Sequence, residues 1–118
     1  PAGCIGPGET KEMTAVREMK EGTGLDFTVY EGGNDSLRNP FFIGPGFTDE
    51  TDASVFGYAS GTVADTQRED TETLEVIFVD KKEARRILKE ERVCLRAAYL
   101  LMQFLQMDAS APFAFLDV

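Results

Sequence analysis

Histidine and tryptophan are absent from this chain of 118 residues, and cysteine occurs only twice. Without histidine, neither a Ser-His-Asp nor a Cys-His nucleophile system can form, and no imidazole is available to bind a metal ion. Two cysteines do not make a disulfide framework. We expect a flexible terminal thiol at Cys4 and a buried helix thiol at Cys94, with a bridge between the two as the alternative.

Long apolar runs and phosphate-binding glycine motifs are also missing. The most apolar stretch, residues 93–107, contains an arginine and two glutamines and falls short of the roughly 18 apolar residues that indicate a membrane span. Residues 3–11 are rich in glycine but lack the spacing of a P-loop. These absences predict a non-catalytic chain, soluble or membrane-peripheral, without a cofactor or metal ion. Paired-carboxylate chemistry stays open, because so acidic a chain offers many pairs of acids.

Basic residues are fewer than acidic residues, and charge is unevenly distributed along the chain. The chain has 12 basic and 21 acidic residues, a net charge of −9, which argues against nucleic-acid binding. Residues 47–80 hold nine acids and one base (net −8), whereas residues 81–107 hold three acids and seven bases (net +4). The acidic clusters at 49–52 and 65–72 lack the spacing of a calcium-binding loop. They predict solvated loops, with a weak calcium site as the alternative.

Apolar periodicity predicts an α+β fold, in which a small antiparallel sheet packs on one long C-terminal helix. Asp80 and Glu83 form a capping-box pattern where this helix begins. We expect residues 1–24 to form an extended arm, rich in glycine and proline, with a possible short helix. A single domain would then span 25–118 and end in an apolar tail, 108–118. The predicted elements are a short helix (10–21), three strands (25–30, 54–60 and 74–79) and the long helix (81–107).

The predicted long helix has two surfaces besides its ordinary core stripe. Its basic residues recur along one face and form a continuous ridge. This ridge either recognises an acidic protein surface or anionic lipid headgroups, or is neutralised by the acidic segment 47–80 of the same chain. A second apolar face must be covered by the arm and tail or by a partner. The residues that we expect to bind a partner are Arg85, Lys89, Arg92, Arg96, Val93, Leu100, Phe104, Phe113 and Phe115.

These features together predict an accessory or scaffolding subunit that docks onto other protein subunits of a larger assembly. The most concrete form is a peripheral subunit of a photosynthetic or respiratory membrane complex, because Pro1 replaces a starting methionine and a targeting segment would have been removed. A virion or phage structural protein and a free-standing small-molecule binding domain are the alternatives. Residues 1–8 carry too few apolar side chains to order themselves, so we expect another chain, or a bridge to Cys94, to hold them.

Overall fold

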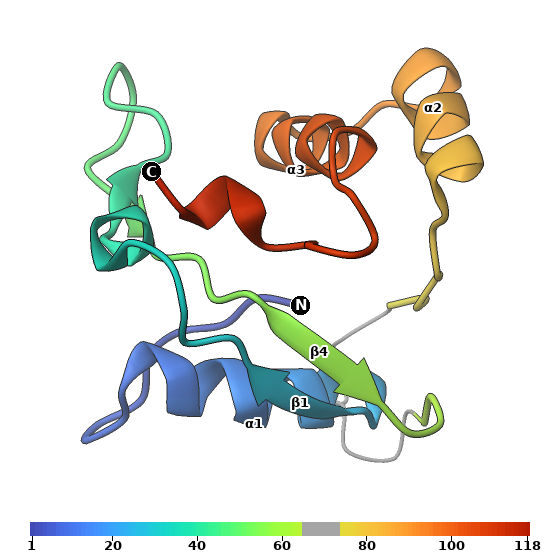
Figure 1. Ribbon diagram of the computed structural model, residues 1–118. Coiled ribbons are helices and arrows are strands. Elements are labelled where there is room, and N and C mark those ends of the chain that lie inside the picture. Colours follow the sequence, from blue (N-terminus) through green and yellow to red (C-terminus); the bar gives the residue numbers. More distant parts are fainter. Residues whose placement is uncertain (65–73) are drawn as a thin grey trace. The chain divides into compact units, whose positions relative to one another are not determined.

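The computed structural model describes residues 1–64 and 74–118 and divides the chain into two compact units, Pro1–Val76 and Ile77–Val118 (Figure 1). The predicted acidic cluster at 65–72 lies entirely outside the described residues. The described residues form three α-helices, two short 3₁₀ helices and two small antiparallel sheets of two strands each. The α+β class is therefore confirmed, whereas the single long helix is not.

In the first unit, helix α1 (Lys11–Thr23) follows the N-terminal arm directly. The side chain of Thr10 caps it by accepting a hydrogen bond from the Met13 amide at 3.2 Å. The helix ends at Gly24, whose φ of 80° lies in the left-handed region that glycine adopts readily. The predicted short helix is thus confirmed and is longer than expected, because Gly24, not Gly22, supplies the left-handed stop.

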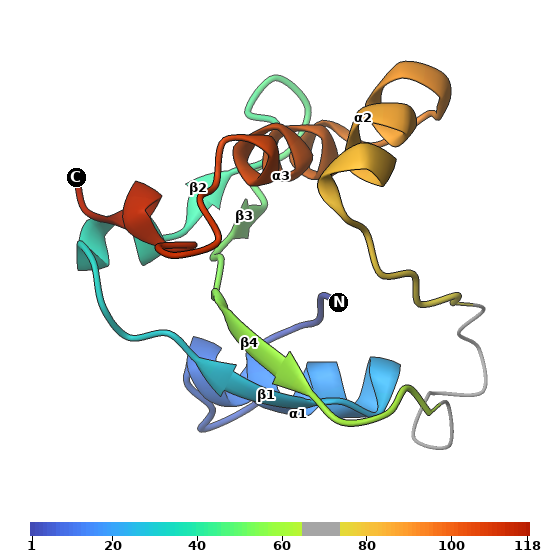
Figure 2. The same cartoon turned by 45° about the vertical axis from the view of Figure 1, so that its right-hand side comes forward.

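Two short strands of the first unit lie along α1 (Figures 1 and 2). Strand β1 (Asp26–Val29) pairs with β4 (Gly57–Ser60) in antiparallel register, with Asp26 opposite Ser60. Two of the three predicted strands are therefore present, with shorter bounds. Leu25 is buried where the chain turns from the helix into β1, so the helix end and the strand start share one apolar contact region.

The second sheet also belongs to the first unit and joins β2 (Phe41–Phe42) to β3 (Thr51–Asp52). A 3₁₀ helix, η1 (Asp35–Arg38), precedes it. The buried side chain of Arg38 donates to the carbonyl oxygens of Tyr30 and Gly32 and pairs with Asp35 at 3.1 Å. Arg38 thereby organises the turn between β1 and β2, because its planar group satisfies several backbone acceptors at once.

In the second unit, the predicted helix over 81–107 is wrong, since the chain forms α2 (Lys81–Glu90) and α3 (Leu95–Leu105). The predicted cap is confirmed in one direction: the Asp80 carboxylate accepts from the Glu83 amide at 2.8 Å. Glu91 and Cys94 are extended, and the Cys94 sulfur caps α3 by accepting from the Ala97 amide at 3.4 Å. The break lets α3 pack against α2, which an uninterrupted helix of about 40 Å could not do.

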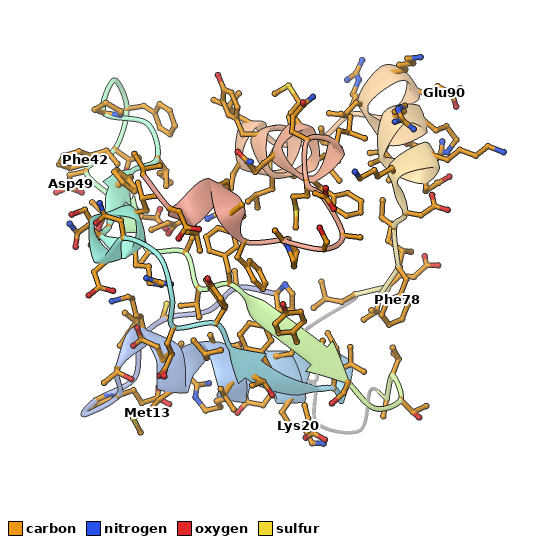
Figure 3. All side chains as sticks on the ribbon, in the orientation of Figure 1. Met13, Lys20, Phe42, Asp49, Phe78 and Glu90 are labelled. Carbon is orange, nitrogen blue, oxygen red and sulfur yellow. The ribbon has the colours of Figure 1, made fainter. Side chains whose placement is uncertain are left out.

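The predicted strand over 74–79 is also wrong. Residues 74–80 have no regular secondary structure, and no described strand pairs with them. Phe78, which projects from this segment in Figure 3, is 74% exposed. Apolar composition predicted a strand, but a strand forms only where a neighbour accepts its hydrogen bonds.

The apolar tail contains a second 3₁₀ helix, η2 (Ala114–Leu116). Phe113 and Leu116 are buried there, as are Ala84 and Ile87 on α2. Among the helices of the described residues, none has the length and apolar character needed to cross a membrane.

Candidate active site

Arg17 on α1 contacts three glutamates and the backbone of the N-terminal arm. Its Nε and Nη2 each donate to Glu9 at 2.9 Å, which makes a bidentate pair. Its Nη1 donates to Glu18 at 2.9 Å and to Glu21 at 3.2 Å. Its Nη2 also donates to the Cys4 carbonyl oxygen at 3.2 Å. The planar fork of a guanidinium suits this arrangement, because it directs several donors at once toward carboxylate oxygens.

Glu9 ties the arm to α1. Its Oε1 accepts from the Gly6 amide at 2.8 Å and from the Thr14 hydroxyl at 3.2 Å, in addition to Arg17. Its Oε2 accepts from Arg17 Nε. Chiefly because of the hydrogen bonds from Arg17, the pKa of the Glu9 carboxyl is lowered from 4.5 to about 2. Both oxygens of Glu9 are therefore engaged in holding the loop.

The arm passes directly against the next glutamate of the helix. A Cβ atom added to Gly3 would lie 2.1 Å from Glu18 Oε1, so only glycine fits this approach without displacing the carboxylate. Contrary to our expectation, α1 of the same chain holds the arm. Both cysteines are free and exposed, so the predicted buried thiol at Cys94 and the bridge to Cys4 were wrong.

Glu18 and Glu21 differ from Glu9 in how they meet Arg17. The arginine contacts only Oε1 of Glu18 and Oε2 of Glu21, so the other oxygen of each carboxylate remains for a ligand. With Glu9 ionised as well, three carboxylates and one guanidinium carry a net charge of −2. The side chains of Glu18 and Glu21 are both partly accessible to solvent. The group therefore offers two acidic oxygens beside a glycine-rich backbone loop.

The carboxylates of this group are hard oxygen donors, which Mg²⁺ prefers. However, no group of three or more histidine, cysteine, aspartate or glutamate residues in ranges 1–64 and 74–118 is arranged to hold a metal ion. Because Glu9 is fully engaged, only Glu18 and Glu21 could contribute. Two carboxylates fall short of a preformed cation site.

The nine residues predicted to bind a partner lie on different elements of the second unit. Arg85 and Lys89 lie on α2, Arg92 lies in the connection and Arg96 lies on α3, so the continuous basic ridge was wrong. Arg86, which we had left out, pairs with three glutamates, Glu83 at 2.7 Å, Glu91 at 3.0 Å and Glu90 at 3.3 Å.

The apolar members of that set have different degrees of exposure. Val93 and Leu100 are exposed, Phe104 and Phe115 are half-buried, and Phe113 is buried. The second apolar face is thus only partly accessible. Partner binding by this set stays a prediction.

Sequence reasoning missed Glu9, Arg17, Glu18 and Glu21. The arm and the short helix had been predicted as an extended segment without a site, and the functional residues had been predicted on the long helix and the tail as partner-binding residues. A usable signal was present, because a glycine-rich segment led directly into a helix in which Arg17 is followed by Glu18 and Glu21. An arginine and a glutamate four residues apart lie on the same helix face.

Residues 1–103 match the family model of the NUDIX domain, so the chain belongs to the NUDIX family. It is 33% identical to "Putative nudix hydrolase 2" of Caenorhabditis elegans over 87 residues. This aligned segment is 69% of this chain and 37% of that protein. It is 31% identical to the ADP-ribose pyrophosphatase of Bacillus subtilis (strain 168) over 109 residues. This aligned segment is 91% of this chain and 56% of that protein. The chain therefore corresponds to 37% and 56% of the length of these relatives. No solved structure matches significantly.

Membership of the NUDIX family overturns the predicted non-catalytic subunit, together with its photosynthetic, respiratory and virion forms. The prediction that the chain is not an enzyme was wrong for a chemical reason. The absence of histidine excludes imidazole catalysis, but carboxylates also transfer protons and orient water. Paired-carboxylate chemistry had been left open without naming residues, and the structure gathers three carboxylates around Arg17.

The depressed pKa of Glu9 predicts an acid-dependent loss of stability. A carboxyl whose pKa is lower in the folded state stabilises the fold above its ordinary pKa of 4.5, and this contribution is lost as the pH falls through about 2. We expect Glu9→Gln to unfold at lower urea concentration than the wild type near neutral pH. The difference should shrink between pH 4.5 and pH 2. Urea titrations at a series of pH values measure it, and a constant difference over that range would contradict the role of Glu9.

Proposed function

We propose that this domain hydrolyses the pyrophosphate bond of a nucleoside diphosphate derivative, and that ADP-ribose is the first substrate to test. The observation that carries the proposal is the group formed by Arg17, Glu9, Glu18 and Glu21, which lies within the residues matched by the NUDIX family. The relative from Bacillus subtilis is named for ADP-ribose pyrophosphatase activity and aligns with 91% of the chain.

The reaction requires a water oxygen to attack one phosphorus while the bond from that phosphorus to the bridging oxygen breaks. The bridging oxygen leaves with the other phosphate, and the proton released by the water must be accepted. From ADP-ribose, the products are AMP and ribose 5-phosphate. A carboxylate oxygen within hydrogen-bond reach of the water can accept its proton, an effect typically worth about 10²–10⁴-fold in rate.

In the proposed reaction, Glu18 or Glu21 orients or deprotonates the water, a role supported by the contact of Arg17 with only one oxygen of each carboxylate. Arg17 acts as a positioning residue: it contacts the carboxylates and the Cys4 carbonyl oxygen. Glu9 holds the guanidinium in place from the other side with a bidentate pair. The arm closes over Glu18 at Gly3, which limits the directions from which water reaches that carboxylate.

A hydrolysis assay with the 118-residue chain tests this function. The chain would be incubated with Mg²⁺ and either ADP-ribose, a dinucleotide or a nucleoside triphosphate, and the products would be separated by chromatography. We expect AMP and ribose 5-phosphate from ADP-ribose. Glu18→Gln should reduce the rate by about 100-fold or more, because the amide cannot accept the proton.

Glu12→Gln is the matched control for this assay. Glu12 lies on the same helix and pairs with Lys11 at 3.4 Å rather than with Arg17. Its replacement should change the rate less than about twofold. The proposal would fail if no pyrophosphate compound were cleaved, or if Glu18→Gln were as active as the wild type.

A further inference from the structure

Arg86 takes up the negative charge of helix α2. The helix and its C-terminal cap contain three glutamates, and Arg86 pairs with all of them, Glu83, Glu90 and Glu91. Because each of these carboxylates already has a positively charged partner, they neutralise the other cations of the helix only weakly. Those cations are therefore the ones available to an external anion.

The other exposed cations of α2 lie on one face. Lys82, Arg85 and Lys89 are spaced by three and four residues, which places them on the same side of the helix, opposite the buried Ala84 and Ile87. All three are exposed, and in the part of the chain that the structure describes none forms an ion pair or a side-chain hydrogen bond. We refer to Lys82, Arg85 and Lys89 as the basic face.

The acidic segment 47–80 does not neutralise the basic face, as far as its described residues show. The two units also differ in charge. Residues 1–76 hold 15 acids and five bases, whereas residues 77–118 hold six acids and seven bases. Charges farther apart than about 8 Å are largely screened at physiological ionic strength. The cations nearest to a bound surface therefore decide whether it is attracted, despite the net charge of −9.

Exposed apolar side chains lie beside the basic face. Ile77 is 61% exposed and Phe78, which projects into solvent in Figure 3, is 74% exposed. Both line the same open hollow as Lys82. Asp80 and Glu83 line it as well, but Asp80 caps the helix and Glu83 pairs with Arg86. The start of α2 thus presents an aromatic ring next to a lysine that has no ion-pair partner among the described residues.

We propose that the basic face and Phe78 bind an anionic phospholipid surface. Exposed lysines and arginines are attracted to the negative headgroups of such a surface, and aromatic rings favour the level of the headgroups. A peptide partner is usually held in a groove or along an unpaired strand. The basic face is instead the convex side of a helix, which suits a flat array of charges. It shares no residue with the group around Arg17, so lipid binding and hydrolysis can be lost separately.

Cosedimentation with vesicles tests the proposal. The protein would be mixed with vesicles of phosphatidylcholine alone, or of equal parts of phosphatidylcholine and phosphatidylserine. We expect the wild type to sediment only with the vesicles that contain phosphatidylserine. Combined replacement of Lys82, Arg85 and Lys89 by glutamine should lower the partition coefficient by about 100-fold, because each cation near such a surface contributes roughly fivefold. A wild type that does not sediment with either kind of vesicle would overturn the proposal.

Two double variants separate the basic face from net charge. Lys82→Gln with Lys89→Gln removes two charges from the basic face. Lys11→Gln with Lys20→Gln removes two charges from α1, where each lysine has an acidic partner. We expect the first pair to weaken vesicle binding by about 20-fold or more, and the second by less than about twofold. Equal losses would show that net charge, not this surface, controls the binding.

A fluorescent side chain distinguishes a lipid from other anions. The chain contains no tryptophan, so Phe78→Trp introduces a single tryptophan at the expected contact. Its emission should shift to shorter wavelength with the anionic vesicles and stay unchanged with phosphatidylcholine alone. Sedimentation without this shift would overturn the role of Phe78. Tighter binding of polyglutamate or of single-stranded DNA than of anionic vesicles would overturn the lipid in favour of an acidic protein or a nucleic acid.

Discussion

Replacing Arg17 by alanine is expected to lower the rate of pyrophosphate hydrolysis by about 100-fold or more, because displacement of a catalytic group by about 1 Å can cost that much. Without the guanidinium, Glu9, Glu18 and Glu21 repel one another, and the Cys4 carbonyl oxygen loses its donor. The arm and the two carboxylates would then move apart. Steady-state kinetics with ADP-ribose measure the loss.

The way in which the rate falls distinguishes positioning from general unfolding. We expect kcat to fall much more than KM rises, with the far-UV circular dichroism unchanged. Arg17→Lys should recover little of the loss, because an ammonium group lacks the planar fork that contacts both Glu9 oxygens. Added guanidinium at millimolar concentration should partly restore Arg17→Ala.

Arg86→Ala is the matched control. Arg86 also pairs with three glutamates, but it lies on α2 and has no place in the proposed chemistry. Its replacement should change kcat less than about twofold. If both arginine variants lost activity equally, or if Arg17→Ala kept the wild-type kcat, the role assigned to Arg17 would be wrong.

Leu116→Ala is expected to lower the free energy of unfolding by about 2–4 kcal/mol, the usual cost of removing a buried leucine side chain. Leu116 is 1% exposed and lies in η2. Truncation would remove apolar contacts and leave a cavity, since a close-packed interior relaxes only in part. Urea unfolding followed by far-UV circular dichroism measures the change.

Leu95→Ala makes the same chemical change at an exposed position. Leu95 is 68% exposed on α3, so its truncation should change the free energy of unfolding by less than about 0.5 kcal/mol. Equal losses in the two variants would show that the tail does not contribute a core side chain.

Elements stabilised by interactions between residues close together in the sequence were predictable. The Asp80 carboxylate caps α2 through the amide of Glu83, three residues away. The short helix after the arm and the strands near 25–30 and 54–60 followed from local periodicity and glycine stops. These interactions form within a few residues, so their pattern is visible in the chain itself.

The break between α2 and α3 could not be predicted in this way. The predicted helix contains no glycine or proline between 81 and 107, so local propensity favoured continuity. The structure has α3 packed against α2, a tertiary contact that local propensity does not include, and Ala84 on α2 is fully buried. The predicted strand at 74–79 failed for the converse reason, since no strand of the described residues pairs with it.

The sequence by itself determined the α+β class, the absence of imidazole chemistry and the start of each of the helices α1 and α2. Only the tertiary structure decided where chemistry can occur. Arg17 donates hydrogen bonds to Glu9, which is eight residues away in the sequence, and to the Cys4 carbonyl oxygen, which is thirteen residues away. A glutamate becomes a loop anchor or an available carboxylate according to how many donors reach its two oxygens. That number depends on how the arm folds back onto α1, because hydrogen bonds are set by distance in space.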